Sequence, residues 1–228
     1  MATVLITGAN KGIGLQLTRI YADAGNKVIA CCRSASGADD LNALEGDIDV
    51  REVVVGDDAS VAALAEALSG QAIDILINNA GTVGPAYDKQ TVGAMDTAGW
   101  AEAFNVNTMG PVRVMQALMS NLKAADSAKI MTVTSQYAAL SFNTPMVYAY
   151  STTKAAVNKF MRLAAVDLGK EGIAVGLVHP GWVQTDMGGP TADLTATESA
   201  EGIVGVIAGL NSDTNGSFWK WNGEEHAW

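Results

Sequence analysis

The chain has 228 residues, of which 49% are hydrophobic and 17% are charged. This length and composition are typical of one folded domain and exclude intrinsic disorder. The formal net charge is −10. Because so acidic a surface repels phosphate backbones and anionic lipids, we expect no nucleic-acid partner and no membrane partner.

The start of the chain and its cysteines predict a cytoplasmic protein. The first ten residues contain no basic region, and no apolar run approaches the ~18 residues that a membrane span needs. Cys31 and Cys32 are neighbours, which disfavours disulfide geometry, and they lie in an apolar run that predicts buried thiols. No cluster of His, Cys and carboxylate residues has the spacing of metal ligands, so we expect no metal.

Short apolar runs alternate with longer helical stretches along the whole chain. The runs are rich in Val, Ile, Leu or Thr, and several lack polar alternation, which indicates strands covered on both faces. The predicted strands are 3–7, 27–32, 52–55, 73–78, 129–134, 174–179 and 217–221, and the predicted helices cover 12–24, 60–69, 97–122, 150–169 and 196–210.

This alternation predicts a single α/β domain over residues 1–228, because no linker, repeat or low-complexity segment interrupts it. The expected fold is a Rossmann-like, doubly wound parallel sheet of about seven strands with helices on both faces. The helices predicted at 97–122 and 150–169 are apolar on nearly every side, so each needs a partner besides the sheet. We therefore expect a homodimer or homotetramer; the alternative is a C-terminal flap over the helix.

A glycine-rich turn links the first predicted strand to the first predicted helix. Gly8 permits a sharp turn, Gly12 leaves room for a phosphate, and Gly14 lets helix and strand pack closely. The helix start then offers unpaired N–H groups and a partial positive charge to a pyrophosphate. The spacing is G-x-x-x-G-x-G and not the commoner G-x-G-x-x-G. The evidence for a dinucleotide site is therefore the position of this turn between a strand and a helix. The expected cofactor-binding residues here are Gly8, Asn10, Lys11, Gly12, Ile13 and Gly14.

The charges near the second predicted strand bear on which dinucleotide binds. NAD sites usually carry a carboxylate where this strand ends. Here the strand ends with Cys31-Cys32-Arg33-Ser34. Arg33 and Lys11 could both face the adenosine ribose, where two cations suit a 2′-phosphate. We therefore expect NADP(H) to be preferred over NAD(H); the alternative is that both are ordinary solvated cations.

A tyrosine and a lysine begin the helix predicted at 150–169. Tyr150 and Lys154 are four residues apart, so their side chains share one helical face. A phenol is a poor base at neutral pH, because its ordinary pKa is about 10. A nearby ammonium and a cationic oxidised nicotinamide would favour the phenolate and lower that pKa. Such a tyrosine can exchange a proton with a carbonyl or alcohol oxygen while hydride moves at carbon.

Six ordered motifs then resemble the short-chain dehydrogenase/reductase family over essentially the whole chain. The closing segments, His179-Pro-Gly-Trp-Val-Gln-Thr-Asp-Met187 and Trp221-Asn-Gly-Glu-Glu-His-Ala-Trp228, resemble its compact C-factor/sniffer-like carbonyl reductase branch. The six motifs are the glycine turn, Asn78-Asn-Ala-Gly81, Asn107, Ser135, the Tyr150/Lys154 pair and Pro180-Gly181.

The resemblance implies a role for each matching residue. Tyr150 is the expected general acid/base, Lys154 lowers its pKa and holds the nicotinamide ribose, and Ser135 holds the substrate oxygen. Asn107 is expected to hold a water that links Lys154 to solvent. The remaining residues implied at the cofactor are Asp57 near the adenine, Asn79, Ala80 and Gly81 along the adenine and ribose, and Pro180, Gly181, Val183 and Thr185 near the carboxamide and phosphate. Asp57 also suits the N-cap of the next helix.

The substrate side departs from the family pattern. Ser135 lies fifteen residues before Tyr150, where about thirteen is usual, so Ser141 and Thr134 are weaker alternatives. The segment 182–194 is short and contains Gly188, Gly189 and Pro190, which predicts an open pocket and broad carbonyl specificity. The residues expected to line that pocket are Tyr137, Met146 and Trp182, with Phe142 as a further candidate; each could equally be a core residue.

The function that these observations favour is an NADPH-dependent carbonyl reductase acting on small to medium aldehydes or ketones. It would also run in reverse as an alcohol dehydrogenase. The alternatives are an NAD-linked alcohol dehydrogenase and a dinucleotide-dependent sensor in which catalysis is incidental. A structural Rossmann domain is disfavoured, because it has no use for a proton relay.

Overall fold

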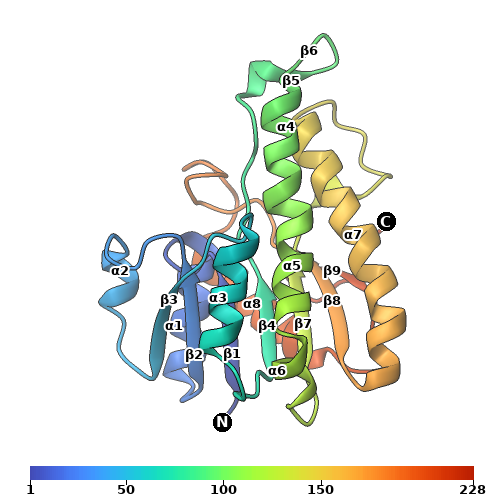
Figure 1. Ribbon diagram of the computed structural model, residues 1–228. Coiled ribbons are helices and arrows are strands. Elements are labelled where there is room, and N and C mark those ends of the chain that lie inside the picture. Colours follow the sequence, from blue (N-terminus) through green and yellow to red (C-terminus); the bar gives the residue numbers. More distant parts are fainter.

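The computed structural model describes residues 1–228 as an α/β fold built on one seven-stranded parallel sheet (Figure 1). The strand order is β3-β2-β1-β4-β7-β8-β9. This order reverses direction between β1 and β4, as in a doubly wound sheet. The strands are β1 (Thr3–Thr7), β2 (Lys27–Cys32), β3 (Ile48–Glu52), β4 (Ile75–Asn78), β7 (Lys129–Val133), β8 (Ala174–His179) and β9 (Phe218–Lys220).

Helices cover both faces of this sheet, as expected. On one face α1 (Gly12–Asp23) and α8 (Ala196–Gly209) bury a core with Val4, Ile6 and Val28. On the other face α3 (Asp58–Ala67), α5 (Gly110–Ala117) and α7 (Tyr148–Leu168) bury a core with Leu5, Ile29 and Leu76. Successive residues of β1 therefore point into different cores, which explains its uninterrupted apolar sequence.

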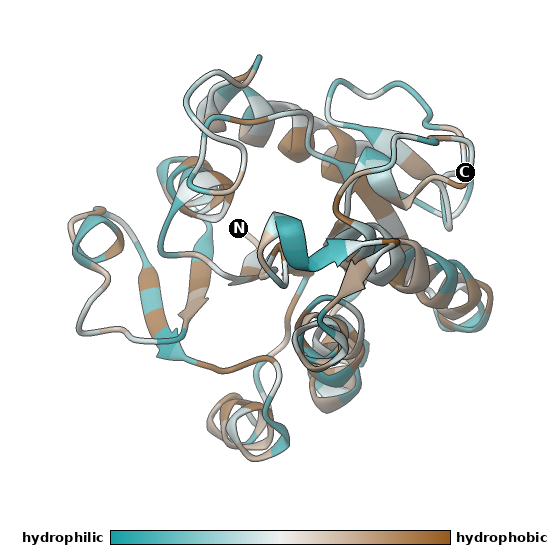
Figure 2. Ribbon diagram, turned by 90° about the horizontal axis from the view of Figure 1, so that it is seen from above, coloured by the Kyte–Doolittle hydropathy of each residue, from teal (hydrophilic) through white to brown (hydrophobic).

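The predicted third strand is wrong in its position. Residues 52–55 were expected because they are apolar, but β3 is Ile48–Glu52, paired in register with β2 from Val28↔Ile48 to Cys32↔Glu52. β3 is an edge strand and only partly buried, so its sequence alternates apolar and charged residues, visible as brown and teal bands in Figure 2. Residues 53–55 instead lead into α3.

The helix predicted at 97–122 is divided into several pieces. α4 (Thr97–Phe104) is capped by Asp96, whose carboxylate accepts from the N–H groups of Ala98 and Gly99. A π-helical segment (Asn105–Met109) follows, then α5 with Pro111 in its first turn, and then α6 (Met119–Lys123). Apolar periodicity identifies this stretch as helical but does not mark where hydrogen bonding changes.

The carboxyl ends of the sheet strands form the edge that bears the site, and Figure 2 looks onto it. Between β4 and α4, residues 82–96 rise away from this edge and carry a small hairpin that the sequence did not predict, β5 (Gln90–Thr91) with β6 (Ala94–Met95) (Figure 1). A short helix, α2 (Asp39–Asn42), was also not predicted. Both cysteines are buried free thiols, as expected. None of the helices has the length and hydropathy of a membrane span.

Candidate active site

The glycine turn has the close packing that its sequence predicts. Gly8 and Gly12 have φ angles of 68° and 53°, in the left-handed region that favours glycine. A Cβ on Gly14 would lie 2.1 Å from the carbonyl oxygen of Gly8, so no larger residue fits. α1 begins here with no acidic residue in its first turn and no side-chain cap. Its first N–H groups therefore remain available to an anion.

Asn79 supports this turn from the neighbouring strand end. Its Nδ2 donates to the carbonyl oxygens of Thr7 and Gly8, each at 3.0 Å. In return, the Thr7 hydroxyl accepts from the backbone N–H groups of Asn79 and Ala80, each at 3.1 Å. The Asn79 side chain therefore fixes the shape of the glycine turn, while Gly81 faces the catalytic residues.

Lys154 is buried on α7 next to Tyr150 and the end of β7. Its Nζ lies 5.8 Å from the centre of the Tyr150 ring and donates to the Val133 carbonyl oxygen at 2.9 Å. An ammonium has three N–H donors, so two remain for other partners such as ribose hydroxyls. Burial lowers the pKa of Lys154 to about 8. A Cβ on Gly81 would lie 3.5 Å from this Nζ, so glycine keeps the approach open.

Tyr150 lies on α7 beside Ser135. Burial raises the pKa of Tyr150 to about 12, although the interaction with the Ser135 side chain acts in the opposite direction. The lowering expected from Lys154 is not among the causes of this shift. The Tyr150 hydroxyl, next to Ser135, can exchange a proton with a substrate oxygen.

Asn107 is completely buried in the π-helical segment, and its amide is engaged by the protein itself. Its Oδ1 accepts from the Thr82 N–H at 2.8 Å, and its Nδ2 donates to the Thr82 carbonyl at 2.8 Å and to the Thr153 hydroxyl at 3.0 Å. Thr153 in turn donates to the Tyr150 carbonyl at 2.7 Å. The Asn107 side chain therefore braces the backbone around Gly81 and Tyr150. π-helical turns often mark functional sites.

Ser135 is the second residue after β7 and is only 7% exposed. Its hydroxyl accepts from the Tyr137 N–H at 3.2 Å and caps a short 3₁₀ turn, Gln136–Ala138. The two alternatives are less suitable. Thr134 is buried, and Ser141 lies near the chain end, where its N–H donates to the Trp228 carbonyl. Ser135 is therefore the hydroxyl that the structure brings to Tyr150.

On the adenine side, Asp57 is the N-cap of α3, with its carboxylate accepting from the Ser60 N–H at 2.6 Å. Arg33 is exposed just beyond β2. Lys11 is also exposed, but it is paired with Asp186 at 2.6 Å. The two cations expected near the ribose therefore differ, because Lys11 has a carboxylate partner and Arg33 has none.

The segment 182–194 lies against the glycine turn. A Cβ on Gly12 would lie 3.0 Å from the Thr185 methyl group, and Val183 is buried below it. Backbone hydrogen bonds of Leu194 with Trp182 and Gln184 close the base of the segment. Pro180 and Gly181 precede it, and Ser199 donates to the Pro180 carbonyl at 2.7 Å. The residues expected at the phosphate and carboxamide thus adjoin the turn.

Two of the three expected substrate-lining residues lie beside Tyr150. The Tyr137 ring is 6.5 Å from the Tyr150 ring, and its hydroxyl is 3.8 Å from the Met146 sulfur. Phe142 packs edge-on against Tyr137 at 5.1 Å. The third residue, Trp182, lies on the other segment, where its indole donates to the Gly188 carbonyl at 2.8 Å.

Some residues near Tyr150 were not identified from the sequence. Thr82 and Thr153 directly adjoin recognised motifs, so their proximity to Asn107 could have been suspected. Gln90, which accepts from the Tyr150 N–H at 3.3 Å, and Tyr87, whose phenol raises the pKa of Tyr150, carry no such signal. Both belong to the irregular residues 82–96.

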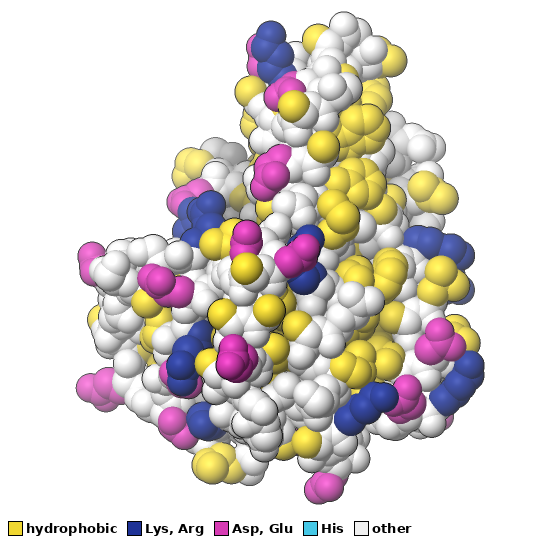
Figure 3. All heavy atoms as spheres, in the orientation of Figure 1, with side chains coloured by type: hydrophobic (Ala, Val, Ile, Leu, Met, Phe, Trp, Pro, Cys, Tyr) yellow, Lys and Arg dark blue, Asp and Glu magenta, His cyan; other side chains and the backbone are white.

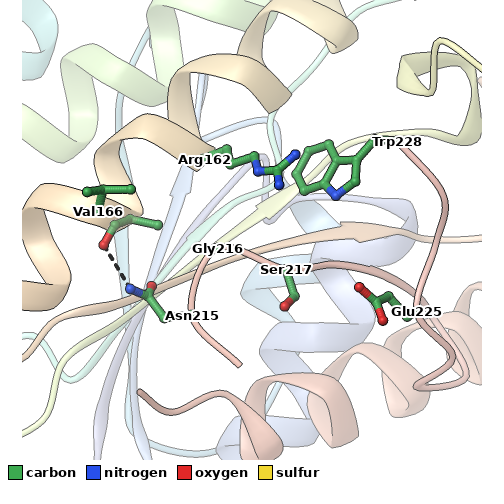
Figure 4. A pocket seen from close by; sticks show the side chains of 8 residues that line it. Arg162, Val166, Asn215, Gly216, Ser217, Glu225 and Trp228 are labelled. Carbon is green, nitrogen blue, oxygen red and sulfur yellow. Dashed lines mark hydrogen bonds between the residues drawn. The ribbon is translucent and has the colours of Figure 1, made fainter. Parts of the chain in front are cut away.

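A hollow of about 250 Å³ lies elsewhere, between α7, residues 215–217 and the chain end (Figure 4). Arg162 lies over the Trp228 ring at 4.3 Å, and Asn215 donates to the Ala165 carbonyl. Arg162 is twelve residues along α7 from Tyr150, or ~18 Å. This hollow contains none of the residues predicted for the active site.

The residues at the carboxyl edge fit a nicotinamide dinucleotide. The glycine turn leaves the space that a pyrophosphate needs, and α1 directs unpaired N–H groups toward it. Lys154 keeps donors for ribose hydroxyls next to Gly81. No group of three or more His, Cys, Asp or Glu side chains is arranged to hold a metal ion.

Comparisons with known proteins place the chain in a family. A family model for short chain dehydrogenases matches residues 2–195. The chain is 42% identical to C-signal of Myxococcus xanthus over 157 residues, covering 68% of this chain and 93% of that protein. It is 34% identical to 1-hydroxy-2-glutathionyl-2-methyl-3-butene dehydrogenase of a Rhodococcus species, covering both chains completely.

Solved structures of carbonyl reductases share the whole fold. The carbonyl reductase Sniffer of D. melanogaster superposes with a TM-score of 0.90 at 28% identity and complete coverage of both chains. An NADPH-bound carbonyl reductase from chicken fatty liver gives a TM-score of 0.92 at 31% identity, covering 100% of this chain and 99% of that one. With a family match over most of its length, the chain belongs to the short-chain dehydrogenase family, in a carbonyl reductase-like branch, and is an NAD(P)-dependent oxidoreductase.

Proposed function

We propose that this protein is an NADPH-dependent carbonyl reductase that converts small to medium aldehydes or ketones to alcohols. The observation that carries the proposal is the geometry around Tyr150: its ring centre lies 5.8 Å from the Nζ of the buried Lys154, and the Ser135 side chain lies beside it. A phenol with an ordinary pKa of about 10 keeps its proton at neutral pH, so Tyr150 can donate the proton that carbonyl reduction requires. The carbonyl reductases with the same fold support the same direction.

Each residue of the proposed site has a distinct task. The Ser135 hydroxyl donates to the substrate oxygen and holds it near Tyr150, where negative charge develops. Tyr150 gives its proton to that oxygen, and the charged Lys154 stabilises the resulting phenolate. Because its pKa is about 8, most Lys154 carries its charge at pH 7. Asn107 keeps Thr82 and Thr153 in place. When bound, the reduced nicotinamide supplies the hydride.

The preference for NADP(H) rests on the charges around the glycine turn. The residue that follows β2 is Arg33 rather than a carboxylate, and it is exposed without an ion-pair partner. Guanidinium groups bind phosphates with paired hydrogen bonds, so Arg33 suits a ribose 2′-phosphate. The NADPH-bound carbonyl reductase from chicken fatty liver and an NADP-bound short-chain dehydrogenase/reductase from Burkholderia multivorans have the same fold.

An alcohol dehydrogenase working in the oxidising direction is the second candidate. The Rhodococcus relative, which aligns over the whole chain, is named as a dehydrogenase. In that direction Tyr150 must first lose its proton, so activity would require the bound cofactor to lower a pKa that is about 12 in the protein alone. One domain carries both the cofactor and the substrate site in either case.

The experiment that tests the function is the substitution Tyr150→Phe. Removing the hydroxyl removes the proton donor, so kcat for NADPH-dependent aldehyde reduction should fall ~10²–10⁴-fold. NADPH affinity, followed by fluorescence titration, should stay within about twofold, and Tyr148→Phe, two residues earlier at the start of α7, is the matched control. A near-normal kcat in Tyr150→Phe would overturn the proposal.

A second copy of the chain is the expected protein partner. The outward face of α7 leaves Phe160, Leu163 and Val166 39%, 55% and 62% exposed, and apolar side chains gather over α4, α5 and α7 in Figure 3. The chain end packs against Arg162, Phe218 and Ser141 and leaves these three apolar side chains exposed. This supports the homodimer or homotetramer expected from the sequence, and a monomeric mass by light scattering would contradict it. A cytoplasmic location remains a prediction.

A further inference from the structure

Residues 82–96 leave the carboxyl edge of the sheet and return at α4, with the β5–β6 hairpin at their tip (Figure 1). Most of this excursion is exposed: Tyr87 is 61% exposed and Val92 92% exposed. One polar side chain is an exception, because Gln90 is completely buried. A glutamine is seldom buried unless its amide has specific partners.

The partners of Gln90 join two segments that are far apart in the sequence. Its Nε2 donates to the Pro85 carbonyl at 2.6 Å and to the Val83 carbonyl at 3.3 Å, so it ties the excursion to its own base. Its Oε1 accepts from the Tyr150 N–H, sixty residues along the chain, at 3.3 Å. One amide thus connects the excursion to the backbone of the proposed catalytic tyrosine.

The start of α7 explains why this connection is needed. The residue before the helix, Val147, has φ 45° and ψ 53°, an unusual left-handed conformation for a β-branched residue. Its apolar side chain cannot accept a hydrogen bond, whereas the first N–H groups of a helix need an acceptor. Tyr150 is the third residue of α7, whose N–H an N-cap side chain ordinarily binds. Gln90 supplies that cap from the excursion.

The excursion also lies close to the chemistry. Asn107 holds its first residue, Thr82, and Trp100 on α4 donates to the Thr152 hydroxyl on α7 at 2.9 Å. A Cβ on Gly84 would lie 3.8 Å from the Ala149 side chain, so the base of the excursion packs against the start of α7. The Tyr137 ring lies beside Tyr150 and contacts Phe142 and Met146. Tyr150 is therefore flanked by the excursion and by the segment that carries Tyr137.

We propose that Gln90 is a positioning residue that sets the backbone of Tyr150 and holds the excursion as one wall of the substrate site. The other wall is Tyr137, Phe142 and Met146. The aromatic and apolar side chains of this second wall favour carbonyl compounds with a flat aromatic substituent, such as aryl ketones. This inference rests on the proposed carbonyl reductase function and deepens it by naming a substrate class.

Two substitutions separate the two tasks of Gln90. Gln90→Met keeps the size of the side chain but removes every hydrogen bond. Gln90→Glu keeps an acceptor for the Tyr150 N–H but removes the donors to Pro85 and Val83. The matched control is Val92→Ser, at the exposed tip of the same excursion. The substrates are a small aliphatic aldehyde, which reports on Tyr150, and an aryl ketone, which also reports on the wall.

With Gln90→Met, kcat for the small aldehyde should fall about tenfold, because small displacements of a catalytic group are costly. KM for the aryl ketone should rise severalfold, while KM for NADPH stays unchanged. Gln90→Glu should keep most of the aldehyde kcat but still raise KM for the ketone, and Val92→Ser should resemble wild type. The proposal would be overturned if Gln90→Met impaired kcat and the KM values for the aldehyde, the ketone and NADPH to the same extent. Wild-type kinetics in Gln90→Met would also overturn it.

Hydrogen exchange at the Tyr150 amide tests, independently of activity, whether Gln90 caps the start of α7. The amide should exchange at least tenfold faster in Gln90→Met than in wild type, and more slowly in Gln90→Glu than in Gln90→Met. Equal protection in wild type and Gln90→Met would refute the cap. If wild type reduced no carbonyl compound, the proposed function would fail, whereas the exchange measurement would still test Gln90.

Discussion

The two sides of the site are built in different ways. The cofactor side, here residues 8–14 and 79–81, consists of short turns that directly follow β1 and β4. The substrate side, here residues 82–96 and 135–147, consists of longer irregular segments that meet above the sheet. On the cofactor side a single added Cβ at Gly14 would lie 2.1 Å from a backbone oxygen. On the substrate side Leu140 and Met146 are 84% and 47% exposed.

This difference separates the binding of the cofactor from the choice of substrate. The tight turns leave no room for change without losing the shape that receives a pyrophosphate. The exposed side chains of the substrate side can be replaced with little effect on folding, because few of them support the core. Tyr150 belongs to both sides, since it follows the substrate segment but faces Lys154 and Gly81.

The largest difference between the cofactor side and the substrate side should appear when the variant Gly14→Ala is compared with Leu140→Ala. The new methyl group in Gly14→Ala must displace the Gly8 backbone, which should cost about 1–3 kcal/mol of unfolding free energy and weaken NADPH binding at least tenfold. Leu140→Ala removes more atoms but from an exposed position, so its free energy of unfolding should change by less than about 0.5 kcal/mol. Chemical denaturation and fluorescence titration measure both. Normal NADPH binding by Gly14→Ala would abolish the distinction.

The same contrast explains what could be predicted from the sequence. The glycine turn and the Tyr150/Lys154 pair depend on neighbours within a few residues, so their spacing was informative. Asn79 acts on Thr7, 72 residues away, and was identified only because it belongs to a family motif. β3 was misplaced because an edge strand has a weaker apolar pattern than the buried residues that follow it. Gln90 was missed because its role depends on a contact with a residue sixty positions away.

The raised pKa of Tyr150 was outside the reach of the sequence for a related reason. The Tyr-x-x-x-Lys spacing indicates that an ammonium is close, which favours a lowered pKa. Burial by segments distant in the sequence raises the pKa and is the largest cause of the shift, whereas Lys154 is not among its causes. This burial can be seen only once the segments around Tyr150 are in place.

A smaller effect confined to the cofactor side is expected from Arg33→Ala. Losing a charged partner of the 2′-phosphate should raise KM for NADPH about tenfold. KM for NADH should stay within about twofold, because NADH lacks that phosphate. The matched control is Arg19→Ala, which removes a different exposed arginine, one that lies on α1. Steady-state kinetics with both cofactors give the ratio, and an equal change for NADPH and NADH would show that Arg33 does not read the phosphate.

The smallest effect concerns the ion pair between Lys11 of the glycine turn and Asp186 of the segment 182–194. Both side chains are largely exposed, so the pair adds little to stability, but it occupies a cation that we expect to lie at the cofactor. Asp186→Asn should free Lys11 and remove a negative charge, lowering KM for NADPH about two- to threefold. This decrease in KM should vanish at high salt, and the decrease in KM for NADH should be smaller.

The pH dependence of this effect follows from the same pair. Lys11 lowers the pKa of Asp186, so the carboxylate stays charged throughout the neutral range and the difference between wild type and Asp186→Asn should be constant from pH 6 to 8. If Asp186→Asn instead raised KM for NADPH, the carboxylate would be holding Lys11 in a productive position. In that case the segment 182–194 would belong with the tightly built cofactor side rather than with the exposed substrate walls.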